Sequence, residues 1–316
     1  MGTNDLDFVK KCSVLFLHDE HGAMVKEVAP PKQQLEGERS MQAPQLFEDR
    51  LAVYRHCPSS PRGQLLIIHG LGEHMGRLSE AFELFCSLDL DVTGIDLPGH
   101  GLSKGPRGHI PSRKRLYDDL DAIRQQAEAT TDSSRLPQFV YGHSLGGHLA
   151  LLYGLRRAPE LDGVIASSPL IAATQPPPLW KLVVAHTVGR LLPSLAVDNG
   201  LKPDYISSVE DEVLAYTQDP LRHRKISARL GLDSLKDCTY LQEHSKRWKL
   251  PLLLMHGKDD QITSCAASEA FAKAAGQTCD WRPWSEARHE LHHDRRKQEV
   301  FDTMSDWLSE RMLANC

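Results

Sequence analysis

The stretch QFVYGHSLGGHLA, residues 138–150, is the most informative part of this 316-residue chain. An apolar run with strand character at 139–141 meets the pentapeptide Gly142-His143-Ser144-Leu145-Gly146, and helical spacing follows. A strand, a sharp turn and a helix are the context that a G-x-S-x-G nucleophile elbow requires, and glycines flank the serine because side chains there would collide with neighbouring backbone. We therefore predict that Ser144 stands at the carboxyl end of a strand, with a helix N-terminus behind it.

The composition is that of an ordinary globular protein, with 41% hydrophobic and 25% charged residues. A chain of this length can bury the core of one large α/β domain or two small ones. Its net charge of −5 provides no electrostatic footprint for nucleic acid, which we do not expect as a partner. The seven cysteines are scattered without a C-x-x-C pair, which favours reduced thiols in a cytoplasmic protein over a disulfide framework. We identify neither a secretory signal nor an apolar run of membrane-spanning length.

Strand-like and helix-like stretches alternate from Phe47 onward. We expect strands at 51–54, 65–68, 91–96, 139–141, 163–166, 252–255 and 279–282, and helices at 78–87, 113–129, 147–155 and 299–313. Regular alternation of this kind predicts the α/β class, with a mostly parallel central sheet and helices on both faces.

Two segments do not follow this alternation. Residues 1–44 form an N-terminal extension with a strand-like run at 12–17 and linker-like composition, and its alternatives are a disordered tail and an appendage to the fold. Residues 171–235 carry a long apolar run at 179–192 and then a polar, helix-like stretch. We expect a lid inserted at the carboxyl ends of the strands, between core segments 45–170 and 236–316. An internal core helix is the alternative for 179–192.

A catalytic triad can be assembled around Ser144. An activated serine needs a base, and the base needs a group that orients it. The strand at 252–255 is followed by a carboxylate-rich loop containing Asp260, and the last strand is followed by His289. The order Ser144, Asp260, His289 is the order that this kind of elbow requires. Other residues compete for the two later roles: Asp259, His256, His292 and His293.

The turn His69-Gly70-Leu71-Gly72 directly follows the strand at 65–68. In a fold with this elbow, that turn supplies the second backbone donor of the oxyanion hole, so we assign the N–H groups of Leu71 and Leu145 to it. No cofactor is needed for this chemistry. We expect no metal site at the histidines 289, 292 and 293, because adjacent histidines without a carboxylate partner at ligand spacing are a poor metal site.

Six stretches of the sequence resemble one enzyme family. They are HGLGEHMGR (69–77), DLPGHGLSKG (96–105), GHSLGG (142–147), AYTQDPL (215–221), GKDDQIT (257–263) and ARHELHH (287–293). Together they are similar to the monoacylglycerol lipase and lysophospholipase branch of the α/β-hydrolases, over roughly residues 45–312. The resemblance implies the α/β-hydrolase fold with a helical lid, a triad of Ser144, Asp260 and His289, and a lipid ester as the substrate.

The resemblance also implies the residues of a substrate pocket. Glu73, Arg77, Tyr216 and His292 match positions that hold a glycerol head group in family members, and a glycerol ester presents two hydroxyls that need donors and acceptors. A structural ion pair that braces the loop is the alternative for Glu73 and Arg77. By the same resemblance the lid offers an apolar surface to lipid and a peripheral contact with a membrane.

Three features depart from the family pattern: the N-terminal extension, a lid that matches clearly only around 216–221, and Leu145 in place of a methionine. The function we expect is hydrolysis of monoacylglycerols to fatty acid and glycerol through an acyl-enzyme. Lysophospholipase or general carboxylesterase activity is the alternative within this chemistry, and acyl transfer or binding without turnover are the alternatives outside it. The sequence leaves the oligomeric state open.

Overall fold

The computed structural model describes residues 41–129, 136–157, 160–175, 187, 189 and 191–314, together with two short strands nearer the N-terminus. Those strands, β1 (Leu15–His18) and β2 (Met24–Glu27), pair antiparallel within a unit of their own, Met1–Ser40. The strand expected at 12–17 overlaps β1. All other elements belong to a second unit, Met41–Cys316.

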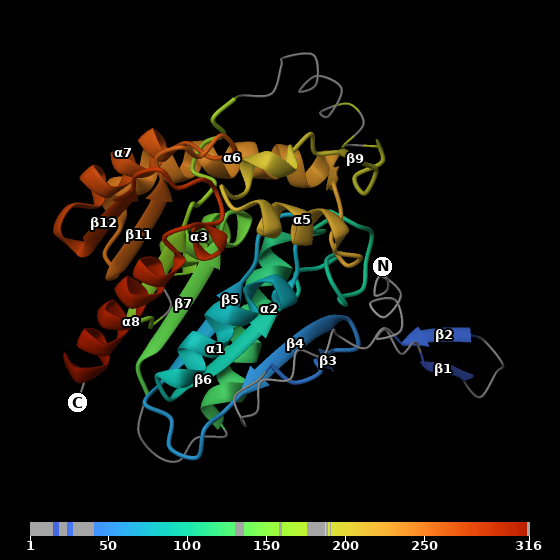
Figure 1. Cartoon of the computed structure of the whole chain (residues 1–316), viewed down its shortest axis with the longest axis horizontal. Helices are drawn as coiled ribbons and strands as arrows, with labels where there is room; N and C mark the ends of the chain where they lie inside the picture. The colour runs from blue at the N-terminus through green and yellow to red at the C-terminus, as the bar shows by residue number, and fades with distance from the viewer. Residues whose placement is uncertain are drawn as a thin grey trace, which may run out of the picture. The chain divides into compact units, whose positions relative to one another are not determined.

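The second unit is built on an eight-stranded sheet in the order β12-β11-β8-β7-β5-β6-β4-β3 (Figure 1). The strands are β3 (Gln45–Phe47), β4 (Leu51–His56), β5 (Gly63–Ile68), β6 (Leu90–Ile95), β7 (Gln138–His143), β8 (Gly163–Ser167), β11 (Leu252–Gly257) and β12 (Cys279–Trp284). The pairs β3–β4 and β4–β6 are antiparallel, and the remaining pairs of neighbours are parallel. The central strands are buried along their whole length, which explains their continuous apolar runs.

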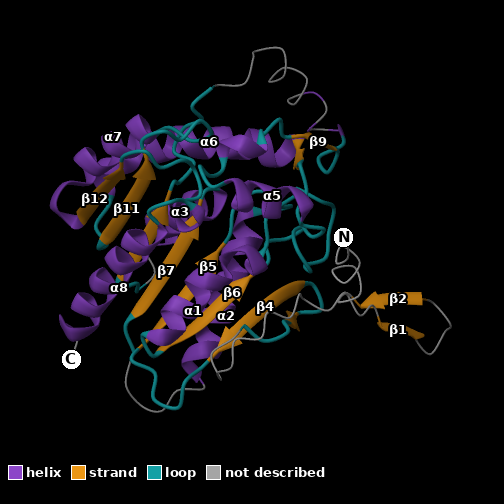
Figure 2. Cartoon of the chain, in the orientation of Figure 1, coloured by secondary structure: helices purple, strands orange, loops and turns teal. Residues whose placement is uncertain are grey.

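Helices cover both faces of this sheet (Figure 2). They are α1 (Ser79–Ser87), α2 (Arg113–Ala129), α3 (Leu145–Arg157), α5 (Glu210–Gln218), α6 (Ala228–His244), α7 (Cys265–Ala275) and α8 (Lys297–Ala314). Successive residues of β5 point to opposite faces, so Leu66 packs in a core with residues of α2, α3, α6 and α7, while Leu65 packs in a second core with α1 and α8. The predicted α/β class, with a mostly parallel sheet between two helical layers, is confirmed.

The chain leaves the sheet between β8 and β11. This insertion contains a two-stranded pairing of β9 (Ala196–Asp198) with β10 (Lys225–Ser227), and the helix α5. Most of the apolar run expected as a lid helix at 179–192 lies outside the described residues. The expected boundary at residue 235 falls inside α6, so one continuous helix joins the insertion to the core. No helix in the described part of the chain is both long and apolar enough to cross a membrane.

Candidate active site

Ser144 occupies the tight turn between β7 and α3. Its φ of 55° lies in the left-handed region, which is strained for a residue with a side chain. A Cβ atom on Gly146 would lie 1.9 Å from the carbonyl oxygen of Ile68, and one on Gly142 would lie 2.3 Å from the carbonyl oxygen of Gly146. Close backbone approach therefore requires both glycines, and the turn holds the serine hydroxyl at the carboxyl end of the sheet.

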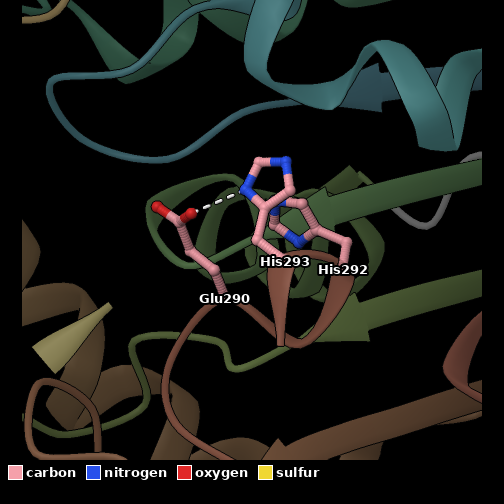
Figure 3. A group of neighbouring side chains, drawn as sticks. All are labelled: Glu290, His292 and His293. Carbon is pink, nitrogen blue, oxygen red and sulfur yellow. Dashed lines mark hydrogen bonds and ion pairs between the residues drawn. The ribbon is translucent and has the colours of Figure 1, made fainter. Parts of the chain in front are cut away.

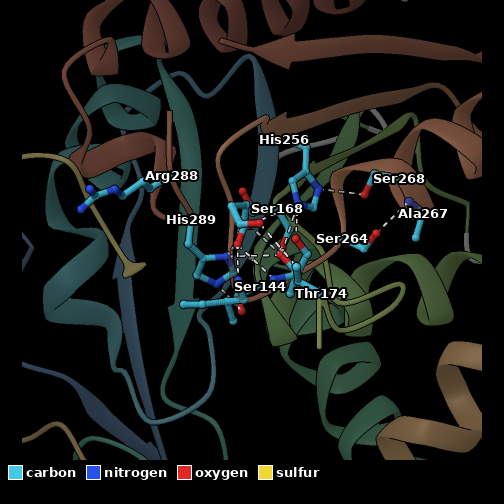
Figure 4. Close-up of polar contacts among 12 residues, drawn as sticks. Ser144, Ser168, Thr174, His256, Ser264, Ala267, Ser268, Arg288 and His289 are labelled. Atoms are coloured by element: carbon cyan, nitrogen blue, oxygen red, sulfur yellow. Dashed lines mark hydrogen bonds and ion pairs between the residues drawn. The ribbon is translucent and has the colours of Figure 1, made fainter. Parts of the chain in front are cut away.

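The three side chains predicted as a triad form one hydrogen-bonded chain, of which Figure 4 labels Ser144 and His289. The Ser144 hydroxyl lies 2.9 Å from His289 Nε2, and His289 Nδ1 lies 2.7 Å from Asp260 Oδ2. Each residue follows a different strand, β7, β11 or β12, so the parallel sheet brings them to one edge. With Nδ1 donating to Asp260, Nε2 is free of a proton and accepts from the serine, as a general base must.

Asp260 is surrounded by hydrogen-bond donors. The N–H groups of Ile262 and Thr263 donate to its Oδ1, at 2.7 and 3.0 Å. The Thr263 hydroxyl donates to Oδ2 at 2.8 Å, and His256 Nε2 lies 3.1 Å from the same oxygen. Burial opposes ionisation of Asp260, but His289 and His256 together lower its pKa well below the ordinary value. Its competitor Asp259 is exposed.

His289 is almost completely buried, with 4% of its surface exposed. Burial opposes protonation of the imidazole, but the Asp260 carboxylate outweighs burial and raises the pKa of His289 above its ordinary value. Among the described residues, His289 is the imidazole in contact with the Ser144 hydroxyl. His256 contacts Asp260 instead, and its Nδ1 lies 2.9 Å from the Ser268 hydroxyl (Figure 4).

The turn after β5 lies against the serine. A Cβ atom on Gly70 would lie 3.1 Å from Ser144 Cβ, so the next residue, Leu71, is close to the reaction centre. Leu145 is the first residue of α3, where peptide N–H groups have no intrahelical partner. The N–H of His223 donates to the carbonyl of Gly72 at 2.9 Å and holds the turn. The oxyanion role of Leu71 and Leu145 stays a prediction.

A set of buried polar side chains lies beside the triad, and we call it the polar cluster. It consists of Glu73, Arg77, His143, Tyr216, Glu290, His292 and His293. Four of them are predicted from the sequence as substrate-binding residues: Glu73, Arg77, Tyr216 and His292. No binding role is predicted for His143, His293 or Glu290, and Glu290 connects the others. Arg77 Nη2 lies 2.6 Å from Glu290 Oε2. His293 Nδ1 lies 2.7 Å from the same oxygen, and Figure 3 shows this contact. Ligand atoms of Glu73, and separately of His292, lie within 4.8 Å of a Glu290 oxygen.

Arg77 is the centre of positive charge in the polar cluster. Its guanidinium carbon lies 4.9 Å from the centroid of the Tyr216 ring, within cation–π range. Its ion-pair partner is Glu290, at 2.6 Å, so the pairing of Arg77 with Glu73 considered from the sequence is not the contact that forms. Glu73 instead accepts a hydrogen bond from the N–H of Gly70 at 3.1 Å.

The two glutamates of the polar cluster have opposite pKa shifts. Burial and the nearby charge of Glu290 raise the pKa of Glu73 well above its ordinary value. Burial also opposes ionisation of Glu290, but Arg77 and His293 lower its pKa well below the ordinary value. Burial lowers the pKa of His143 to about 3, and it lowers the pKa of His292 well below 6.5. These directions favour the charged forms of Arg77 and Glu290, and the neutral forms of Glu73, His143 and His292.

The family profile described as serine aminopeptidase, S33 matches residues 59–296. The chain belongs to this family. It is an α/β-hydrolase, and its resemblance to monoacylglycerol lipases is confirmed by similar proteins.

Similar proteins cover most of this α/β-hydrolase. A monoacylglycerol lipase of Mycolicibacterium smegmatis is 28% identical over 252 residues, 79% of this chain and 89% of the relative. Phospholipase YtpA of Bacillus subtilis is 32% identical over 244 residues, 76% of this chain and 93% of the relative. The crystal structure of Paleococcus ferrophilus monoacylglycerol lipase has a TM-score of 0.75 and 32% identity, covering 82% of this chain and 99% of that chain. An uncharacterised abhydrolase domain-containing protein of Dictyostelium discoideum is 36% identical over 255 residues, 80% of this chain. That relative is much longer, and the match covers only 27% of its length.

Within the described part of the chain, two groups of side chains have ligand atoms close enough to hold a metal ion. They are Glu290, His292 and His293, and Glu73, His143 and Glu290. The expectation that the histidines lack a carboxylate partner is therefore wrong, because Glu290 contacts His293. In the first group Arg77 Nη2 lies 2.6 Å from Glu290 and 3.1 Å from His293, so a guanidinium already stands where a cation would bind.

The signal for Glu290 was present in the sequence. It directly follows His289 in the stretch ARHELHH, and residues 289–293 fit the pattern H-E-x-x-H, with Glu290 as its glutamate. Its partner Arg77 is 213 residues away in the chain, so only the fold shows that the two side chains meet.

Proposed function

We propose that this α/β-hydrolase cleaves the ester bond of monoacylglycerols and releases a fatty acid and glycerol. The hydrogen-bonded chain from Ser144 through His289 to Asp260 carries the proposal. Ser144 Oγ attacks the ester carbonyl while its proton passes to His289 Nε2, and the N–H groups of Leu71 and Leu145 stabilise the oxyanion. His289 then protonates the departing glycerol oxygen, and water releases the fatty acid by the same route.

The glycerol end of the substrate is proposed to bind in the polar cluster, at Glu73, Arg77, Tyr216 and His292. Two atoms support this placement. His292 Nδ1 and Arg77 Nε are buried and have no hydrogen-bond partner among the described residues. Buried polar atoms are rarely left unpaired, so a hydroxylated ligand or water is expected to satisfy them.

The similar proteins support more than one head group. Two of them are named as monoacylglycerol lipases, and one is named as a phospholipase. Hydrolysis of lysophospholipids is therefore the second candidate function, and it differs from the first in the charge of the alcohol part.

We also propose that the segment 171–235 acts as a lid that contacts a lipid surface. Five large apolar side chains of this segment are exposed: Leu191, Leu192, Leu195, Val197 and Leu214. Exposed apolar side chains close together in the chain are typical of surfaces that meet lipid or another protein. A cytoplasmic location at a membrane surface is consistent with the free thiols of Cys57 and Cys265.

The experiment that tests the function compares three substrates. They are 1-oleoyl glycerol, 1-oleoyl lysophosphatidylcholine and the soluble ester p-nitrophenyl butyrate. We expect the monoacylglycerol to have the highest kcat/KM, and Ser144→Ala to lower kcat for every ester by about 10⁴-fold or more. Ser87→Ala removes an exposed hydroxyl at the end of α1 and should leave kcat unchanged.

Two results would contradict the proposal in different ways. Undiminished esterase activity of Ser144→Ala would show that Ser144 is not the nucleophile, and the triad assignment would be wrong. Preference for the lysophospholipid would be compatible with the triad, but it would contradict the proposal that the polar cluster binds glycerol.

A further inference from the structure

We infer that Glu290 makes the polar cluster select esters of uncharged alcohols and reject esters of anionic ones, by holding the Arg77 guanidinium as its own ion-pair partner. The inference rests on the proposed function and specifies it: the alcohol part is a neutral polyol and carries no phosphate.

The ion pair is buried and fixed before any substrate arrives. The side chain of Arg77 is 6% exposed and that of Glu290 is fully buried, with 2.6 Å between Nη2 and Oε2. His293 Nδ1 contacts the same Glu290 oxygen at 2.7 Å. The N–H of Glu290 donates to the carbonyl of Ile206 at 2.7 Å, which anchors its backbone to the insertion. The pairing therefore does not depend on a ligand.

The pairing decides which head group the polar cluster can accept. A guanidinium binds phosphate through parallel N–H donors, and Arg77 is the member of the cluster that could do so. Glu290 already balances the charge of this guanidinium, so a phosphate would have to enter a buried site beside a carboxylate, without a counter-charge of its own. Burying an unpaired charge is costly.

Hydroxyl groups face no such penalty. Glu290 Oε1, His292 Nδ1 and both ring nitrogens of His143 are buried and have no hydrogen-bond partner among the described residues. These atoms can donate to or accept from the hydroxyls of a polyol, and the hydroxyls bring no charge that would have to be buried. The polar cluster is thus complementary to a neutral, hydroxylated alcohol.

A second guanidinium lies near the polar cluster. Arg222 stands 4.1 Å from the centroid of the Tyr216 ring and is partly exposed. Binding of a phosphate by Arg222 would overturn the inference.

The test uses the full chain and two substrates that differ in one phosphate. These are 1-oleoyl glycerol and 1-oleoyl glycerol 3-phosphate, presented in the same mixed micelles, with p-nitrophenyl butyrate to report on the triad of each variant. For the wild-type protein we expect kcat/KM to favour the neutral ester by roughly 100-fold or more. Glu290→Gln keeps the shape of the side chain and removes its charge. It should therefore raise kcat/KM for the phosphate ester and reduce the ratio at least about tenfold.

Two further variants test whether the gain in activity on the phosphate ester comes from the Arg77 guanidinium. Adding Arg77→Met to Glu290→Gln should abolish the gain, because the freed guanidinium is then absent. Glu80→Gln removes an exposed carboxylate that pairs with Lys297, and it should leave the ratio unchanged.

An unchanged ratio in a Glu290→Gln protein that still hydrolyses p-nitrophenyl butyrate overturns the inference alone. A wild-type protein that hydrolyses the phosphate ester as well as the neutral ester overturns it too, and loss of that activity in Arg222→Gln would assign the anion to Arg222. A wild-type protein active only on p-nitrophenyl butyrate overturns the proposed function, and this inference with it.

Inhibition of the wild-type protein provides a test if Glu290→Gln does not fold. Glycerol and glycerol 3-phosphate are compared as inhibitors of p-nitrophenyl butyrate hydrolysis at equal ionic strength. We expect glycerol 3-phosphate to inhibit no better than glycerol, and tighter inhibition by the phosphate overturns the inference.

Discussion

Asp260 and Glu290 are two buried carboxylates close to the same histidine, and they differ in the partner that holds them. Asp260 lies 2.7 Å from His289 Nδ1, a group that gains and loses a proton. Glu290 follows His289 in the chain and lies 2.6 Å from Arg77, whose charge is permanent. Both carboxylates keep a lowered pKa despite burial. The comparison shows that the partner of a buried carboxylate determines its role. Beside an imidazole the carboxylate supports proton transfer, and beside a guanidinium it fixes the charge of a binding site.

The largest expected effect comes from removing the charge of Asp260. Asp260→Asn would present an amide to His289 Nδ1 and favour the wrong imidazole tautomer, so kcat for p-nitrophenyl butyrate should fall about 10⁴-fold. The matched control is Asp259→Asn, the same substitution at the exposed neighbour, which should change kcat less than about twofold. If Asp260→Asn kept kcat within tenfold of wild type, Asp260 would not be the orienting group.

The two carboxylates also differ in how far the sequence predicts them. Asp260 could be predicted because its role depends on the order of the triad residues along the chain and on its own position after β11. Both are visible in the sequence. The strand and helix pattern from Leu51 onward was predictable for a similar reason, since buried parallel strands are continuous apolar runs. Glu290 could not be assigned, because its pairing depends on a side chain in the turn before α1 that only the folded sheet brings near.

The second expected effect concerns stability. Arg77→Met would leave Glu290 buried without its partner, which typically costs about 3–5 kcal/mol in the free energy of unfolding. Lys297→Met breaks a partly exposed pair with Glu80 and should cost less than about 1 kcal/mol. Urea denaturation of both variants measures the difference. Equal, small losses would mean that Glu290 does not need Arg77 and is held neutral by its other neighbours.

The smallest expected effect is a shift of the pH profile. His289 must be unprotonated to accept the serine proton, so kcat/KM for p-nitrophenyl butyrate should rise with pH and fall about tenfold per unit below its midpoint. Asp260 raises the pKa of His289, which places the midpoint above about 6.5. Because the charge of Glu290 also raises that pKa, though less than Asp260 does, Glu290→Gln should lower the midpoint only slightly.

Profiles between about pH 5 and 9 for wild type, Glu290→Gln and the control Glu80→Gln measure this shift. If kcat/KM of the wild-type protein did not change with pH over this range, His289 would not be the general base. A midpoint that moved down by several units in Glu290→Gln would mean that Glu290, and not Asp260, supplies most of the charge felt by the imidazole. A midpoint that moved up would show that Glu290 does not carry its charge in the folded protein. The small downward shift is the one outcome that keeps both roles, because it requires Glu290 to be charged and yet remote from the proton that His289 transfers.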